Sequence, residues 1–224
     1  MIIIGNGRLI TRNAAEPYYE NGAVVTENEL IKETGTTAEM RLKYPDAEFV
    51  DAKGGVIMPA FINAHTHIYS ALARGLSIAG YNPTNFYEVL DGMWWKIDRS
   101  LTLEDTRRSA YTTIIDCIKT GCTPIFDHHA SFCQIEGSLF AIADAAKALG
   151  IRACLCYEVS ERDGEKKCDE SIEENKSFID HCERENDPML KAMFGGHALF
   201  TIGDKTFEKC VKANGGRTGF HIHV

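Results

Sequence analysis

The residues best suited to chemistry are two His-x-His pairs, His65-Thr66-His67 and His221-Ile222-His223. The first pair follows the apolar run at residues 55–64, and the second follows residues 218–220. Side chains two positions apart on a β-strand point to the same face, so such a pair at a strand end aims two imidazoles at one point. Imidazole nitrogens bind Zn²⁺ or Fe²⁺ at roughly 2.0–2.1 Å, and a catalytic site leaves one position for water. The two pairs therefore predict a divalent-metal centre.

The composition predicts a soluble globular protein of one or two domains. The chain has 224 residues, of which 44% are hydrophobic and 25% charged, which is enough for a large core. Its net charge of -8 argues against a nucleic-acid or anionic-membrane partner. The chain start lacks the basic stretch of a signal peptide, and no apolar run reaches the roughly 18 residues of a membrane span. We expect a cytoplasmic protein with a small-molecule partner, and the sequence is compatible with a homo-oligomer.

Eight cysteines occur without any Cys-x-x-Cys spacing. Several lie inside apolar patterns, which favours free, mostly buried thiols in a reducing compartment. A cysteine-rich metal site is the alternative, but the paired spacings that it requires are missing.

Two regions differ in their patterns. Residues 1–57 contain short apolar runs, a polar turn at Glu27-Asn28 and a short helical stretch at 37–43, which predicts a small, incomplete β domain. From residue 58 to 224 strand and helix patterns alternate. The expected strands are residues 56–63, 122–127, 152–158, 190–195 and 219–224. The expected helices are residues 103–120, 138–149, 171–185 and 204–214, with Thr102 and Asp204 as N-caps.

Alternating strands and helices give a parallel sheet covered by helices, either doubly wound or the first five units of a (β/α)8 barrel. Periodicity alone does not separate the two. Polar residues recur where the strands end, and in a barrel all these ends surround one mouth. This favours the α/β barrel, with the small β domain before it.

The motifs around these residues also resemble a known family. Residues 58–67 resemble the Pro-Gly-Phe-x-Asn-x-His-x-His signature of the amidohydrolase superfamily, in its branch of nucleobase and triazine deaminases and chlorohydrolases. Segments 93–99, 120–131, 195–201 and 219–223 look like aminohydrolases of the SsnA type. The chain departs from the family pattern at Ala60, where glycine is usual, and at Leu199, where proline is usual.

The resemblance implies roles for particular residues. His65, His67 and His223 match the family's metal ligands, with His221 a neighbour, and His197 matches a histidine that contacts substrate. The Glu, His and Asp that move protons in the family would lie beyond Val224, so we expect no catalytic proton-transfer residue in this chain. The chain then corresponds to an N-terminal portion that is inactive alone.

Other residues are weaker candidates for binding substrate. His129, in Asp127-His128-His129, could line the pocket or cap a turn. Glu158 could hold a polar ring substituent or belong to a solvated loop. Trp95 could stack on a heterocycle or pack on a helix face. Asp98 aligns loosely with a substrate-binding acid of the relatives.

The implied reaction is hydrolytic. One divalent metal, Zn or Fe, would lower the pKa of its bound water, and the resulting hydroxide would displace ammonia from a purine- or pyrimidine-like ring. A cyclic amidohydrolase or a chlorohydrolase on the same scaffold is the alternative. A non-catalytic metal-binding protein is the hypothesis from another class.

Overall fold

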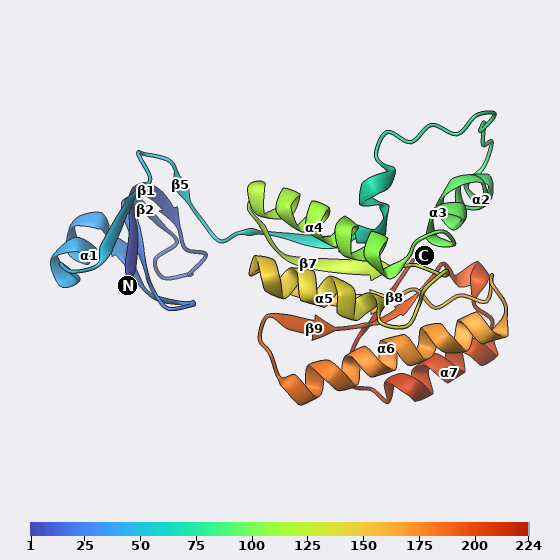
Figure 1. Ribbon diagram of the computed structural model, residues 1–224. Coiled ribbons are helices and arrows are strands. Elements are labelled where there is room, and N and C mark those ends of the chain that lie inside the picture. Colours follow the sequence, from blue (N-terminus) through green and yellow to red (C-terminus); the bar gives the residue numbers. More distant parts are fainter. Residues whose placement is uncertain (224) are drawn as a thin grey trace. The chain divides into compact units, whose positions relative to one another are not determined.

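The computed structural model describes residues 1–223; Val224, the last residue of an expected strand, lies outside them. The chain divides into two compact units, Met1–Ala60 and Phe61–Val224 (Figure 1). Among the described residues, the first unit has one sheet and one buried apolar cluster, and the second has two of each.

The first unit is a five-stranded sheet with one helix. Its elements are β1 (Ile2–Ile10), β2 (Tyr18–Glu27), β3 (Leu30–Thr36), α1 (Thr37–Lys43), β4 (Glu48–Asp51) and β5 (Val56–Ile57). The strand order is β3-β2-β1-β4, with β5 also paired to β1. The expected turn at Glu27-Asn28 is confirmed, because Glu27 pairs with Leu30 across a hairpin and Asn28 takes the left-handed conformation with φ 55°.

The strands of the second unit pair in parallel. They are β6 (Phe61–Thr66), β7 (Cys122–His129), β8 (Ala153–Tyr157), β9 (Leu190–Ala192), β10 (Phe194–Gly196) and β11 (Phe220–Ile222). One sheet has the order β6-β7-β8-β9, and β10 pairs with β11. A bridge between Val159 and Gly196 connects the two sheets just beyond β8.

Four long helices alternate with these strands, as the sequence predicts: α4 (Leu103–Lys119), α5 (Ser138–Leu149), α6 (Glu165–Glu185) and α7 (Asp204–Asn214). Short helical turns fill the segment between β6 and α4: η1 (Ile68–Ala73), α2 (Phe86–Val89), the π-helical turn η2 (Leu90–Trp94) and α3 (Trp95–Asp98). A further turn, η3 (Leu199–Thr201), follows β10. Gly150 and Gly215 end α5 and α7 in the left-handed conformation that glycine adopts without strain.

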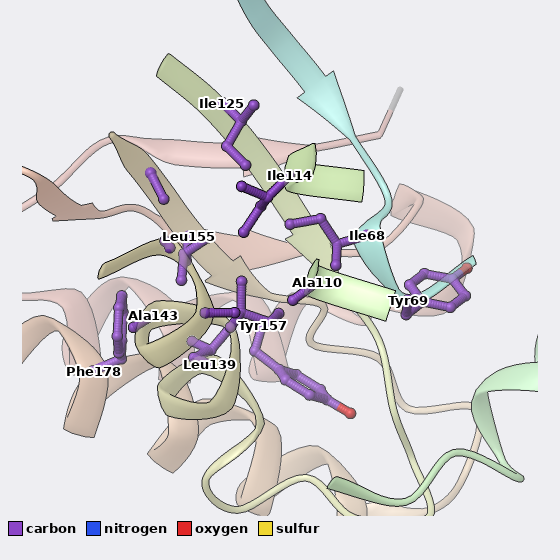
Figure 2. Packing of buried hydrophobic residues seen from close by; sticks show 14 of the residues in the cluster. Ile68, Tyr69, Ala110, Ile114, Ile125, Leu139, Ala143, Leu155, Tyr157 and Phe178 are labelled. Atoms are coloured by element: carbon purple, nitrogen blue, oxygen red, sulfur yellow. The ribbon is translucent and has the colours of Figure 1, made fainter. Parts of the chain in front are cut away.

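The main core lies between the sheet and helices α4 to α6. Figure 2 shows labelled side chains from β7, β8, α4 and α5 pointing toward one another. Ile125 and Leu155 come from the strands, and Ile114 and Leu139 from the helices; all four are fully buried. This packing fixes which faces of β7 and β8 point away from the helices.

Several expected boundaries differ from the structure. The strand expected at 56–63 is two strands, β5 and β6, and the strand expected at 190–195 is interrupted at Met193. Asp204 is not an N-cap, because Gly203 occupies that position and Asp204 is the first helical residue. Thr102 is an N-cap as predicted and forms a capping box with Asp105.

The parallel strands of the second unit follow a curve rather than a flat sheet. β6 and β11 are the first and last strands of this unit, yet Nδ1 of His65 lies 2.8 Å from Nε2 of His221. Two edges of an open sheet are separated by the width of the strands between them. The sheet therefore curls so that these ends meet, as in the first part of a (β/α)8 barrel.

Two further observations complete the fold. Among residues 1–223, no helix combines the length and apolar character that a membrane crossing requires. All eight cysteines are free; Cys122 is partly exposed, Cys133 is exposed and the other six are buried.

Candidate metal centre

Three histidines predicted as ligands converge at the carboxyl ends of the strands. His65 lies in β6, His67 directly after it, and His223 directly after β11. Each offers one ring nitrogen, and these three atoms lie within 4.8 Å of one another. Nε2 of His65 is 3.2 Å from Nε2 of His67, close to the edge of about 3.3 Å that tetrahedral bonds of about 2.05 Å produce. The geometry is suitable for a divalent transition metal.

Hydrogen bonds set which ring nitrogens are free to bind. Nδ1–H of His67 donates to the backbone carbonyl of His128 at 2.8 Å, which leaves the lone pair of His67 on Nε2. Nδ1 of His65 pairs with Nε2 of His221. His221 is thus placed to orient His65 through its second nitrogen.

The surroundings keep these imidazoles neutral. Burial, with a contribution from the charge of His128, lowers the pKa of His67 to about 4 and that of His223 to about 3. Burial likewise lowers the pKa of His65 below its usual value. A metal binds neutral imidazole, so at neutral pH the three side chains are already in the required state.

A buried carboxylate lies behind the three histidines. Glu158 follows β8, has 3% of its surface exposed and faces two histidines and an arginine. Its Oε2 is 3.5 Å from Nδ1 of His128, and its Oε1 is 3.7 Å from Nε2 of His197 and 3.5 Å from Nη2 of Arg162. Burial alone would raise the pKa of Glu158, but His128, His197 and Arg162 together lower it to about 2. Glu158 is an anion inside the protein.

Asp98 and Arg162 form a bidentate ion pair at the edge of this cluster. Nη2 and Nη1 of Arg162 lie 2.5 and 3.2 Å from the two carboxylate oxygens of Asp98. The guanidinium also stacks on Phe132 at 4.0 Å and on Trp95 at 5.0 Å. Arg162 lies in a charge-rich stretch, a composition typical of a solvated surface, whereas its side chain is only 4% exposed.

A cavity of about 730 Å³ opens in front of the histidines. Four predicted substrate-binding residues line it: Trp95, Asp98, Glu158 and His197. Apolar side chains such as Phe86 and Leu199 form much of the remaining wall. Nδ1–H of His197 donates to the hydroxyl of Thr201 at 2.8 Å, and this hydroxyl donates in turn to the carbonyl of Ala198. Nε2 of His197 is therefore an acceptor.

His129, the fifth predicted substrate-binding residue, lies fully buried and does not line this cavity. Its Nε2–H donates to Ser131, and burial lowers its pKa to about 3. Strand β7 continues to His129 instead of ending at Asp127, so neighbouring residues alternate between its faces. This alternation turns His128 toward the metal-ligand cluster and His129 toward the core, a distinction that sequence reasoning missed.

The fold and this site define a β/α-barrel protein with a histidine cluster of metal-ligand geometry. A sequence profile of the amidohydrolase family matches residues 56–224, and an imidazolonepropionase-like composite domain of bacteria matches residues 22–47. The chain belongs to the amidohydrolase family. The finer resemblance to SsnA-type aminohydrolases stays a prediction.

Known proteins with similar sequence or structure agree with this family. A 5'-deoxyadenosine deaminase of Methanosarcina barkeri is 30% identical over all of this chain and 48% of its own length. A zinc-complexed atrazine chlorohydrolase from Arthrobacter aurescens is similar over 100% of this chain and 52% of its own, with a TM-score of 0.77 and 19% identity. E. coli guanine deaminase is similar over 100% and 54%, with a TM-score of 0.80 and 16% identity. The chain spans about half the length of the curated relatives it matches.

Proposed function

We propose that the protein is a metal-dependent hydrolase that releases ammonia from a planar nitrogen heterocycle of the purine or pyrimidine type. The observation that carries this proposal is three imidazole donors at one wall of a cavity of about 730 Å³. Aromatic and apolar side chains suit the faces of a flat ring, and a few polar groups suit its edge. The names of the similar proteins, two deaminases and one triazine chlorohydrolase, support a heterocyclic substrate.

We propose zinc as the metal, bound by His65, His67 and His223. The zinc in the similar chlorohydrolase supports this choice, although three imidazoles also suit Fe²⁺. Such a metal supplies Lewis acidity and a water of lowered pKa. The side chains of this chain would hold it: His67 through Nε2, with Nδ1 fixed on the carbonyl of His128.

Other side chains would position the heterocycle. Nε2 of His197 is an acceptor that faces the cavity wall and can receive an N–H of the ring. Trp95, which is 5% exposed, offers part of its indole to the cavity beside His197. Asp98 has its oxygens occupied by Arg162, so its proposed part is to hold this wall in place. Free thiols accord with the cytoplasm as the site of action.

The test is ammonia release from a panel of aminated purines, pyrimidines and their nucleosides by the natural protein loaded with Zn²⁺. We expect turnover of at least one compound. His65→Ala and His67→Ala should each lose bound zinc, measured by elemental analysis, together with activity. The control is His181→Ala, a half-buried histidine of α6 far from these ligands in the sequence, which should keep both.

The second candidate is a chlorohydrolase, favoured by the structural similarity to the triazine enzyme. The same panel should therefore include chlorinated triazines and a cyclic amide. Chloride release or ring opening without any ammonia would overturn the deaminase proposal and leave a hydrolase of another substrate class. Undiminished zinc in the His65→Ala His67→Ala double variant would overturn the ligand assignment.

A further inference from the structure

A buried tyrosine at the wall of the cavity has a hydroxyl that the protein leaves without a partner. Tyr69 has 7% of its surface exposed and lines the cavity of about 730 Å³. Its backbone carbonyl accepts a hydrogen bond from Ser109, but its hydroxyl forms no hydrogen bond among residues 1–223. Figure 2 shows the ring at the edge of the apolar cluster, with the hydroxyl directed away from Ile114 and Ile125. This O–H is therefore available to a molecule inside the cavity.

Tyr157, in the same apolar cluster, shows how a buried tyrosine is normally satisfied. It is fully buried, and its hydroxyl accepts the backbone N–H of Ser131 at 3.0 Å. Buried hydroxyls usually have such a partner, because removing one from water without compensation is unfavourable. A phenylalanine at position 69 would fill the same space without this penalty. The hydroxyl of Tyr69 therefore indicates a partner that comes from outside the protein.

The backbone on both sides of Tyr69 is fixed by hydrogen bonds. Tyr69 is the second residue of η1, and the N–H of Ile68 before it donates to Oδ1 of Asp127 at 2.7 Å. The N–H of Ser70 after it donates to the carbonyl of His67 at 3.1 Å. A donor that is already held in place loses little conformational freedom when it binds a ligand. Tyr69 is thus suited to recognise one atom at a defined position.

Tyr69 and His197 lie beside different ligands of the proposed metal. The ring centroid of Tyr69 is 5.7 Å from that of His67, and the centroid of His197 is 5.8 Å from that of His223. The two ligand rings are themselves 5.1 Å apart. Ser70 also lines the cavity, but its hydroxyl already donates to the carbonyl of His67 at 2.8 Å. A planar ring in front of the ligands would therefore meet a free O–H donor beside His67 and the acceptor of His197 beside His223.

We propose that Tyr69 is a specificity-determining residue, whose hydroxyl donates a hydrogen bond to an unprotonated ring nitrogen at the edge of the heterocycle. The inference rests on the proposed function, since the heterocycle is the substrate class proposed there. A ring with C–H in place of this nitrogen would leave the hydroxyl unpaired and would bind more weakly. Tyr69 thereby selects among planar rings that fit the cavity equally well.

Matched heterocycles test the proposal. Adenine, cytosine and their deaza analogues, each with a single ring nitrogen replaced by C–H, are titrated into the zinc-loaded protein while the fluorescence of Trp94 and Trp95 is measured. We expect Tyr69→Phe to weaken the binding of a parent compound by about 3- to 10-fold. One analogue of that parent should bind the natural protein and Tyr69→Phe equally, because it lacks the acceptor. The control Tyr111→Phe, a tyrosine of α4 with 36% of its surface exposed, should bind every compound as the natural protein does.

Equal weakening for the parents and all their analogues, no weakening at all, or no binding of any compound to the natural protein would overturn the proposal. Urea unfolding adds a test that needs no ligand. The midpoint of Tyr69→Phe should be unchanged or higher, because the hydroxyl has no partner in the protein, and a lower midpoint would overturn the proposal. The proposed function fails separately, if the natural protein releases ammonia from none of the compounds in its panel, so the two failures are distinguishable.

Discussion

At the scale of single residues, the end of strand β7 determines which way the side chains of His128 and His129 point. The two side chains are adjacent in sequence, but Nδ1 of His128 lies beside Glu158, whereas His129 is hydrogen-bonded to Ser131 in the core. The sequence places both after the second expected strand, where polar residues would surround the mouth of a barrel. It does not separate the two residues, because the strand is expected to end at Asp127. Side chains beyond the end of a strand are not expected to alternate between its two faces.

Arg162 is the residue whose importance the sequence hides most completely. A run of charged residues normally indicates a solvated surface, and the stretch at 161–174 has that composition. The signal that would have found Arg162 is spatial, since Asp98 and Phe132 come from distant segments. Only folding brings a carboxylate and an aromatic face to the guanidinium.

We predict that Arg162→Lys lowers the free energy of unfolding by about 2–4 kcal/mol, because a lysine cannot form the bidentate pair and leaves buried Asp98 poorly compensated. Urea unfolding followed by tryptophan fluorescence measures this change. The control is Arg99→Lys, whose pair with Asp163 is more exposed; its unfolding midpoint should stay nearly unchanged. Equal effects of the two variants would contradict a special role for the Asp98–Arg162 pair.

At the scale of elements, the N-terminus of helix α5 is capped by a side chain from another helix and not by its own N-cap residue. Its predicted bounds, 138–149, are those observed, because small and apolar residues repeat at helical spacing and Gly150 ends it. Its N-cap, Gly137, has no side chain to accept the first amide hydrogens. The carboxylate of Glu174 from α6 accepts them instead, from the backbone N–H groups of Gly137 and Leu139, both at 2.9 Å.

We predict that Glu174→Ala lowers the free energy of unfolding by about 2 kcal/mol, since two amides at the start of α5 lose a buried acceptor. Denaturation in urea provides the measurement. The neighbouring Glu173 has 62% of its side chain exposed and pairs with Lys176, so Glu173→Ala is a matched control that should have little effect. If the free energy of unfolding decreased less in Glu174→Ala than in Glu173→Ala, the cap formed by Glu174 would be unimportant for stability.

The helical pattern of α6 itself was only partly predictable. Expected from residue 171, it begins at Glu165, because the segment before the apolar repeat, with five charged residues and the buried Cys168, is also helical. The interrupted strand of β9 and β10 was missed for the opposite reason. Only Lys191 interrupts its apolar run in sequence and nothing marks a break at Met193, but β9 pairs with β8 and β10 with β11, so the chain changes partners there.

At the scale of the whole molecule, the second unit encloses several neutral histidines. His67, His129 and His223 have pKa values of about 4, 3 and 3 in the folded state, lowered first by burial. In the unfolded chain each would have a pKa of about 6.5. Between these values the unfolded state binds more protons, so stability rises with pH over this window and falls as the pH decreases through 6.5.

We therefore predict that the metal-free protein loses stability between pH 7 and pH 5, by at most about 1.4 kcal/mol per pH unit for each such histidine. The protein has only two tryptophans, Trp94 and Trp95, and both belong to the second unit. Tryptophan fluorescence during urea denaturation therefore reports on the unfolding of this unit. His129→Gln should reduce the dependence on pH. An unfolding free energy that is constant from pH 7 to pH 5 would contradict the prediction.

The hydrogen bond from Nδ1 of His67 to the carbonyl of His128 also bears on the speed of metal uptake. Because this bond and the low pKa leave Nε2 bare at neutral pH, an arriving cation has no proton to displace there. Loading through His67, a proposed ligand, then needs no base from the buffer. We expect the rate of metal uptake to follow how fast the hydrated ion sheds its own water, which is a property of the metal.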